Sequence, residues 1–337
     1  MRRILRRRWD PDLLVRLGLA AAVFVGLMIA DPGFRTVGNF WAMLNNFALD
    51  GVIALGVGIT MIAGEFDISV GAIVPVCGIV TLSVLSLGVV AAIIIATVGA
   101  LLFGLFQGWL IARLRINSLP VTIATLIGGG GLTYIIAHDK PVSLPIQYIP
   151  LANTLEQRIW IFSPISIGAI VLYVIVGLGL RYLRSGREIY AIGGGRAEAF
   201  AAGVSRYRPL ILIFCISAVF AGLTGAFTSI TSGGMALGAQ ENLLLGAVTA
   251  ALVGGVGLDG GRGTVPGIAA GVLILAALQS EISLRALPLY DQDLANGAVL
   301  LLVLSAETGL RAYQRMAMAR KEAVEDIGRP SDASTQV

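Results

Sequence analysis

Long apolar segments, separated by short breaks of charge, proline and glycine, are the feature that most limits how this 337-residue chain can fold. A helix needs about 20 apolar residues to cross a bilayer, and a charge at mid-bilayer costs about 2.5 to 3.5 kcal/mol on insertion scales. The chain is 56% hydrophobic and 13% charged, and its charges gather between the apolar segments. This pattern predicts an all-α polytopic membrane protein and excludes an ordinary soluble domain.

The apolar segments predict about ten transmembrane helices. They cover residues 13–30, 42–63, 67–87, 89–112, 120–137, 161–183, 210–228, 243–257, 265–278 and 294–306. The segments 243–257 and 265–278 are short, so we expect each to be tilted or broken. Residues 138–160 are polar and proline-containing, and we expect a small outer structure there without assigning it a helix.

The arginines predict the orientation, because cytoplasmic loops carry an excess of positive charge. With an even number of spans both termini are cytoplasmic, and the inner side then holds most arginines, including five within residues 2–8. The outer side keeps Arg35, Lys140, Arg158 and Arg285. We therefore predict a basic cytoplasmic amino terminus (1–12), a transmembrane domain (13–312) and a cytoplasmic tail (313–337) that is disordered at its end.

Residues with catalytic or metal-binding chemistry are scarce. His138 is the single histidine, and Cys77 and Cys215 both lie in apolar segments, which favours packing over a metal site or disulfide. The two lysines, Lys140 and Lys321, follow Asp and Arg, whereas a P-loop needs Gly-Lys. No basic stripe with interleaved aromatics points to nucleic acid. We predict that the chain is not an enzyme and binds no metal, cofactor or nucleic acid itself.

Residues 185–209, here called the polar island, are rich in charge and glycine. They separate two of the apolar segments and cannot lie in lipid. The topology puts this island on the cytoplasmic side. We expect a sharp turn at residues 193–195, a short helix within 196–202, and the next span beginning at Pro209. The candidate docking residues are Gly193, Gly194, Gly195, Arg196, Ala197, Glu198, Ala199 and Gly203.

Two further motifs are predicted on the same side. They comprise Glu65, Asp67, Ser69 and Gly71, and then Gly260, Gly261, Arg262 and Gly263. The Asp67 side chain can cap free amides of the helix that follows. Carboxylates within a membrane also indicate an ion or proton path, so this alternative stays open for Glu65 and Asp67, although we favour capping or contact with a partner.

Polar residues within the spans are candidates for a translocation path, with hydrogen bonding between helices as the alternative. They are Asn45, Asn46, Gln107, Thr122, Thr125, Gln279 and Asn296. Glycines one helical turn apart, at 104 and 108 and at 267 and 271, predict close helix packing either within the bundle or between subunits.

Four stretches together resemble the permease subunits of bacterial ribose-type sugar ABC importers, a family with relatives for arabinose, xylose, rhamnose and autoinducer-2. Residues 64–71 are similar to the family's Gly-Gly-Ile-Asp-Leu-Ser-Val-Gly, and 122–126 to its Ile-Ala-Thr-Leu stretch. Residues 186–194 resemble Gly-Arg-x-Ile-Tyr-Ala-Ile-Gly-Gly, and 254–263 resemble Gly-Gly-x-x-Leu-x-Gly-Gly-Arg-Gly. Glu65, Gly195 and Glu198 depart from the family, where Gly, Asn and Ala are usual.

The resemblance implies an ABC importer permease fold in the bacterial cytoplasmic (inner) membrane. It implies three partners: an ABC ATPase that binds the ATP, a second permease that is identical or a paralogue, and an extracytoplasmic sugar-binding protein. The expected function is the transmembrane permease subunit of an ATP-driven importer for a sugar or sugar-like solute. The alternative is an ion-coupled secondary transporter of a small polar solute, which would need an ion site in mid-membrane.

Overall fold

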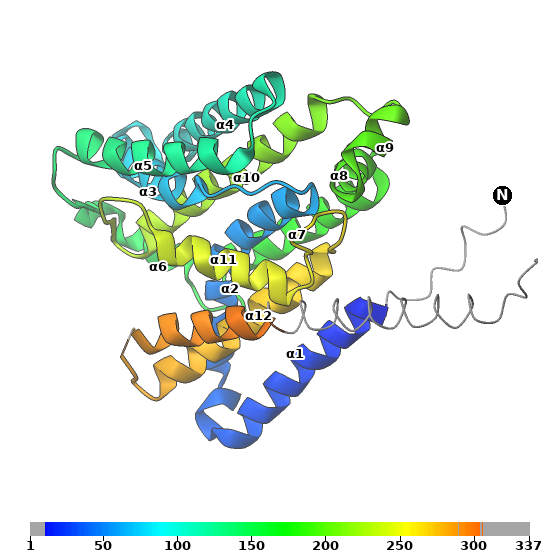
Figure 1. The fold of residues 1–337 in the computed structure, drawn as a ribbon. Coiled ribbons are helices and arrows are strands. Elements are labelled where there is room, and N and C mark those ends of the chain that lie inside the picture. The colour runs from blue at the N-terminus through cyan, green and yellow to red at the C-terminus, as the bar shows by residue number, and fades with distance from the viewer. Residues whose placement is uncertain (1–10, 289, 304, 306–337) are drawn as a thin grey trace, which may run out of the picture. The chain divides into compact units, whose positions relative to one another are not determined.

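The computed structural model describes residues 11–288, 290–303 and 305, and they are mostly helical (Figure 1). The chain divides into two compact units, residues 1–296 and 297–337. Residues 290–296 end the first unit as part of a helix, and residues 297–303 of the second unit are helical. The basic residues 1–10 and the predicted tail 313–337 lie outside the described residues.

The first unit contains the labelled elements of Figure 1. Its amino-terminal half comprises α1 (Pro11–Ala30), η1 (Pro32–Arg35), α2 (Val37–Ile62), α3 (Val70–Ser83), η2 (Leu85–Leu87), α4 (Val89–Leu114), α5 (Ser118–Ala137), β1 (Val142–Ser143), η3 (Ile146–Tyr148) and α6 (Ile149–Leu155). Its other elements are α7 (Pro164–Tyr182), α8 (Arg184–Gly194), α9 (Arg196–Ala201), α10 (Arg208–Thr231), β2 (Gly234–Met235), α11 (Glu241–Val253) and α12 (Val265–Leu284).

Seven helices of the described residues are long and apolar enough to cross a membrane: α1, α2, α4, α5, α7, α10 and α12. Each overlaps a predicted span, so the polytopic helical architecture is confirmed. The predicted spans 67–87 and 243–257 contain helices of only 14 and 13 residues, α3 and α11. The segment 265–278 was expected to be short, whereas α12 continues to Leu284 and has 20 residues.

The start of α2 differs from the prediction in a way that matters for the site. Thr36 caps this helix by accepting a hydrogen bond from the Asn39 amide, so α2 begins at Val37 and not near residue 42. Asp50 therefore lies near the middle of a 26-residue helix, whereas it lies nearer the start of the predicted span 42–63.

Helix α10 packs against α2, α3 and α4, and glycine makes this contact close. A Cβ atom on Gly104 of α4 would lie 2.5 Å from the Phe214 carbonyl oxygen of α10. On α12, a Cβ on Gly271 would overlap the Ala250 carbonyl oxygen of α11. Both glycine pairs thus pack helices within the chain, as the first of the two sequence interpretations expected.

The small structure expected within residues 138–160 is present between α5 and α7. Strand β1 pairs antiparallel with β2, with Val142 opposite Met235. The same segment contains η3 and the helix α6. The sequence analysis assigned no helix here because the segment is polar and contains prolines. Pro150 stands in the first turn of α6, where a missing amide hydrogen costs nothing, so this proline is compatible with the helix.

Candidate functional site

The polar island forms two helices instead of one. The predicted short helix is α9, Arg196–Ala201. The predicted turn at 193–195 is confined to Gly195, because Gly193 and Gly194 are the last residues of α8. Helix α8 buries Ile189 and Ile192, which gives this glycine-containing segment an apolar face to pack. The sequence had indicated no helix here because glycine disfavours helices in isolation.

The three predicted cytoplasmic motifs meet in one place, here called the glycine joint: residues 62–65, 193–194 and 260–263. The Gly261 amide donates a hydrogen bond of 2.7 Å to the Ile62 carbonyl oxygen. A Cβ on Gly260 would lie 2.8 Å from the Gly64 Cα atom, and one on Gly261 would lie 2.7 Å from the Gly194 Cα atom. Gly260 and Gly261 also have positive φ angles of 79° and 70°, which glycine adopts without strain. At Gly260 and Gly261 the backbones touch directly, and a side chain would not fit.

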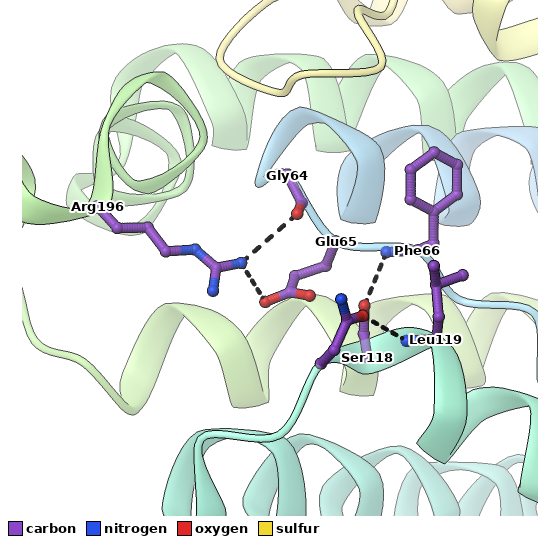
Figure 2. A network of polar contacts seen from close by, with 7 residues as sticks. Gly64, Glu65, Phe66, Ser118, Leu119 and Arg196 are labelled. Atoms are coloured by element: carbon purple, nitrogen blue, oxygen red, sulfur yellow. Dashed lines mark hydrogen bonds and ion pairs between the residues drawn. The ribbon is translucent and has the colours of Figure 1, made fainter.

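An ion pair joins α9 to this joint (Figure 2). The Arg196 Nη2 atom lies 2.5 Å from Glu65 Oε1 and 3.5 Å from the Gly64 carbonyl oxygen. The Glu65 side chain is 5% exposed and that of Arg196 is 50% exposed. Next to it, the Phe66 amide donates to the Ser118 hydroxyl at 3.1 Å, which attaches the segment to α5. Glu65 thus contacts a cationic side chain of the same chain.

Asp67 lies in a buried hydrogen-bond network just before α3. Its Oδ1 atom accepts hydrogen bonds from the Ser69 amide (3.1 Å) and the Ser69 hydroxyl (2.5 Å), and Gln107 Nε2 donates to that hydroxyl at 3.0 Å. Asp67 therefore orders the residues that lead into α3, although its partner is Ser69 and not an amide within the helix. Burial raises the pKa of the Asp67 carboxyl, and the hydrogen bonds from the Ser69 hydroxyl and amide oppose that rise.

The other residues of the motifs divide into packed and exposed groups. The Gly71 carbonyl oxygen accepts a hydrogen bond from the Gln240 amide at 2.8 Å, and Ala199 lies on the buried side of α9. The exposed group contains Arg196, Ala197, Glu198, Gly203 and Arg262. Helix α9 therefore exposes Arg196, Ala197 and Glu198 to solvent. The buried Ala199 and the ion pair to Glu65 attach the helix to the bundle.

A polar cavity of about 170 Å³ lies in the first unit between α2, α11, α12 and the helical residues 290–296. It brings together three of the predicted path residues, Asn46, Gln279 and Asn296. It also contains residues that the sequence analysis did not single out, and these are Asp50, Asn242, Gln292 and Asp293. The signal that could have found Asp50 is its spacing, because Asn46 and Asp50 are four residues apart and share one helix face.

The remaining path candidates lie elsewhere and hydrogen-bond within the bundle. The Ser163 hydroxyl at the start of α7 donates to Asn45 Oδ1, and Gln107 belongs to the Asp67 network. The Thr122 hydroxyl donates to the Ser118 carbonyl at 3.0 Å, and that of Thr125 donates to the Val121 carbonyl at 3.1 Å. The contacts of Asn45 and Gln107 join different segments of the bundle, as the alternative of hydrogen bonding between helices expected, whereas the two threonine contacts lie within α5.

Comparison with known proteins identifies the family. The sequence model of the family described as branched-chain amino acid transport system / permease component matches residues 39–304. The chain belongs to this permease family. The permease is 32% identical over 304 residues to the L-arabinose ABC transporter permease protein AraH of Azospirillum brasilense, which covers 88% of this chain and 87% of that protein. It is 28% identical over 290 residues to the ribose import permease protein RbsC of Bacillus subtilis (strain 168), covering 85% and 89%.

A third relative, the L-arabinose transport system permease protein AraH of Escherichia coli (strain K12), is 31% identical over 305 residues, covering 88% of this chain and 89% of that protein. No solved structure matches the permease. The resemblance to ribose-type ABC permeases is thus confirmed. The permease is a multi-pass membrane subunit of an ABC transporter and not an enzyme, as predicted.

Proposed function

We propose that this permease forms the membrane path of an ATP-driven importer for a sugar or sugar-like solute and is moved by a separate ABC ATPase. The observation that carries the proposal is the glycine joint, which brings together the three motifs predicted to be cytoplasmic and attaches the exposed α9 to them through Arg196 and Glu65. The sugar is proposed because the relatives are named for L-arabinose and ribose.

The proposed topology has ten spans with both termini in the cytoplasm of a bacterial inner membrane. The arginine distribution supports it, since α8, α9 and the segment after them contain Arg184, Arg187, Arg196, Arg206 and Arg208. A second permease, identical or a paralogue, would complete the path, and an extracytoplasmic sugar-binding protein would deliver the solute to the opposite face.

The proposed coupling runs through α9. An ATPase that docks on the exposed Arg196, Ala197, Glu198 and Gly203 would push α9 when it closes on ATP. The ion pair to Glu65 and the close backbone contacts at the joint would pass that push to α2 and to the turn between α11 and α12. Packed elements of this kind move as rigid bodies between discrete states, which exchanges outward for inward opening.

Bulky replacements on α9 test the docking surface. We expect Glu198→Trp and Gly203→Trp to abolish ATP-driven uptake in proteoliposomes while the permease still inserts, because Glu198 is exposed and no atom of the described residues lies within 4 Å of a Cβ on Gly203. Gly203 has a φ of 85°, so the milder Gly203→Asn, which tolerates that conformation, is the control for backbone strain. Unchanged uptake in both tryptophan variants would move the dock to the turn at residues 260–263.

Purification in mild detergent, followed by mass spectrometry, tests the partners. We expect an ABC ATPase to accompany the wild-type permease and to be lost from the tryptophan variants. Recovery of neither an ATPase nor a sugar-binding protein would contradict the proposal.

An ion-coupled secondary transporter is the second candidate, and Asp50 is the observation that favours it. This carboxylate stands near the middle of α2, where an ionisable residue commonly serves transport. Uptake driven by a proton or sodium gradient in proteoliposomes without an ATPase would favour this candidate over the first.

A further inference from the structure

The walls of the polar cavity are regular helix faces. On α2 they carry Asn46 and Asp50, and on α11 they carry Asn242, Gly246 and Ala250, each four residues after the one before. Residues four apart lie on the same side of a helix, one above the other. The cavity therefore runs along the helices, with Asp50 near the middle of α2.

The polar groups of the cavity have few protein partners. Among the described residues, the one hydrogen bond between two lining side chains joins Asn242 Nδ2 to Asp293 Oδ2 at 3.3 Å. The side chains of Asn46, Asp50 and Gln279 make no hydrogen bond in the described part of the chain. Polar groups inside a membrane bundle are costly unless they meet a partner. A volume of about 170 Å³ exceeds the roughly 10 to 15 Å³ that a single water needs, so the partners include more than one small molecule or a larger solute.

The chemistry of the lining selects the solute. Carboxylates accept hydrogen bonds, and the side-chain amides of Asn and Gln both donate and accept them. Neighbouring hydroxyl groups of a sugar also donate and accept, so they match this set. Among the residues that the structure describes, no lysine, arginine or histidine lines the cavity, while Asp50 and Asp293 do. An anionic solute, or the carboxylate of an amino acid, would meet negative charge and find no cation to pair with.

We infer that this cavity is a binding subsite for an uncharged polyhydroxylated solute, held by Asp50 together with Asn46 and Gln279, inside the membrane path. The inference rests on the proposed function and deepens it, because it assigns solute contact to the permease itself. The subsite accepts neutral sugars and rejects sugar acids and amino acids, although the family description names branched-chain amino acids.

Thiol labelling of the full-length permease in proteoliposomes tests the subsite without an ATPase. Gln279→Cys places a thiol on the wall, and a small charged methanethiosulfonate reagent should modify it because a polar-lined cavity of about 170 Å³ has room for water. The wild type, with Cys77 buried and Cys215 half-buried, gives the background. A neutral sugar at about ten times its dissociation constant leaves about one tenth of the sites free, so labelling should slow about tenfold.

The probes are a panel of neutral pentoses and hexoses that includes L-arabinose and D-ribose, compared with D-ribonate and L-leucine. We expect protection from a neutral sugar and none from D-ribonate or L-leucine. Adding Asp50→Asn should raise the sugar concentration needed for half-protection about tenfold, because a hydrogen bond to a charged group is lost. Asp31→Asn is the matched control, since Asp31 binds the Gly33 amide outside the cavity and the amide oxygen of Asn can replace it.

Absence of labelling, protection by L-leucine or D-ribonate, or an unchanged half-protection concentration of the sugar in the Asp50→Asn variant would each overturn the inference. The proposed function is tested separately by ATP-driven sugar uptake with the co-purified ATPase and binding protein. Uptake without protection refutes the subsite alone, whereas protection without ATP-driven uptake refutes the ATPase coupling and leaves the subsite standing.

Discussion

Loss of the Glu65–Arg196 ion pair should weaken the attachment of α9, and the two partners should not be equivalent. Exposed ion pairs contribute about 0.2 to 1 kcal/mol, and hydrogen bonds to buried charged groups about 1.5 to 3 kcal/mol. Here Glu65 is 5% exposed and Arg196 is 50% exposed, so we place the pair between these cases, at about 1 to 2 kcal/mol. That range changes the ratio of attached to detached α9 by about 5- to 30-fold.

The difference in burial sets the order of the two single variants. In Glu65→Gln the Arg196 side chain, half in solvent already, regains water at little cost. In Arg196→Gln the carboxylate of Glu65 stays buried without its cation, which costs more than the pair itself contributes. We therefore expect Arg196→Gln to be the more destabilising variant, and the double variant to recover part of that loss.

A double-mutant cycle measures this coupling. The free energy of unfolding of the purified permease in mixed SDS micelles should show an interaction of about 1 to 2 kcal/mol between the two positions, and the ratio of sugar uptake to ATP hydrolysis should fall in both single variants. The control cycle uses Arg184 and Glu188, an i,i+4 pair whose arginine is 79% exposed, for which about 0.3 to 0.5 kcal/mol is expected. Additive effects of Glu65→Gln and Arg196→Gln, within about 0.5 kcal/mol, would refute the argument.

Three further variants test the packing and the Asp67 network. Gly261→Ala should abolish recovery of folded permease in detergent, measured by size-exclusion chromatography, because the φ of Gly261 is 70° and a Cβ there would lie 2.7 Å from the Gly194 Cα atom. The control is Gly128→Ala on α5, which should be recovered normally because no atom of the described residues lies within 4 Å of a Cβ on Gly128. Gly104→Ala should lower the thermal midpoint by separating α4 from α10, whereas Gly99→Ala on the same helix should not. Asp67→Asn keeps an oxygen for Ser69 and avoids burial of a charge, so uptake should persist at all pH values; loss of a pH-driven component would instead support the ion path.

The positions of the seven long apolar helices were predictable from the sequence because lipid imposes a strong constraint on length and charge. The short helix α9 was also predicted, since Gly195 and the charged residues after it separate it from the spans. By contrast, helix α8 was not predicted, because Gly186 and Gly193 lower the helix propensity of this segment. In the fold these glycines fit against the Leu180 and Ile62 backbones, so tertiary contact outweighs propensity.

The polar cavity could be predicted only in part. Hydropathy identifies polar residues inside spans, and three of the seven predicted path residues line the cavity. It does not say which helix faces meet, so Asn45 and Asn46, adjacent in sequence, have different surroundings: one accepts a hydrogen bond from Ser163 and the other faces the cavity. The central position of Asp50 in α2 was not predicted for a further reason, because the cap at Thr36 lies outside the apolar segment and extends the helix towards the amino terminus.

Helix α2 connects the two halves of the proposed function. Its carboxyl end, Ile62, accepts a backbone hydrogen bond at the glycine joint, and Asp50 lies twelve residues earlier, which is about 18 Å along a helix. The turn at 260–263, also part of the joint, connects α11 and α12, and both of these helices line the cavity. We therefore infer that displacement of the joint by α9 moves three cavity walls together. A cavity that changes shape in this way would bind a solute in one state and release it in the other. Protection of Gln279→Cys by the sugar should therefore differ between ATP-bound and nucleotide-free assemblies.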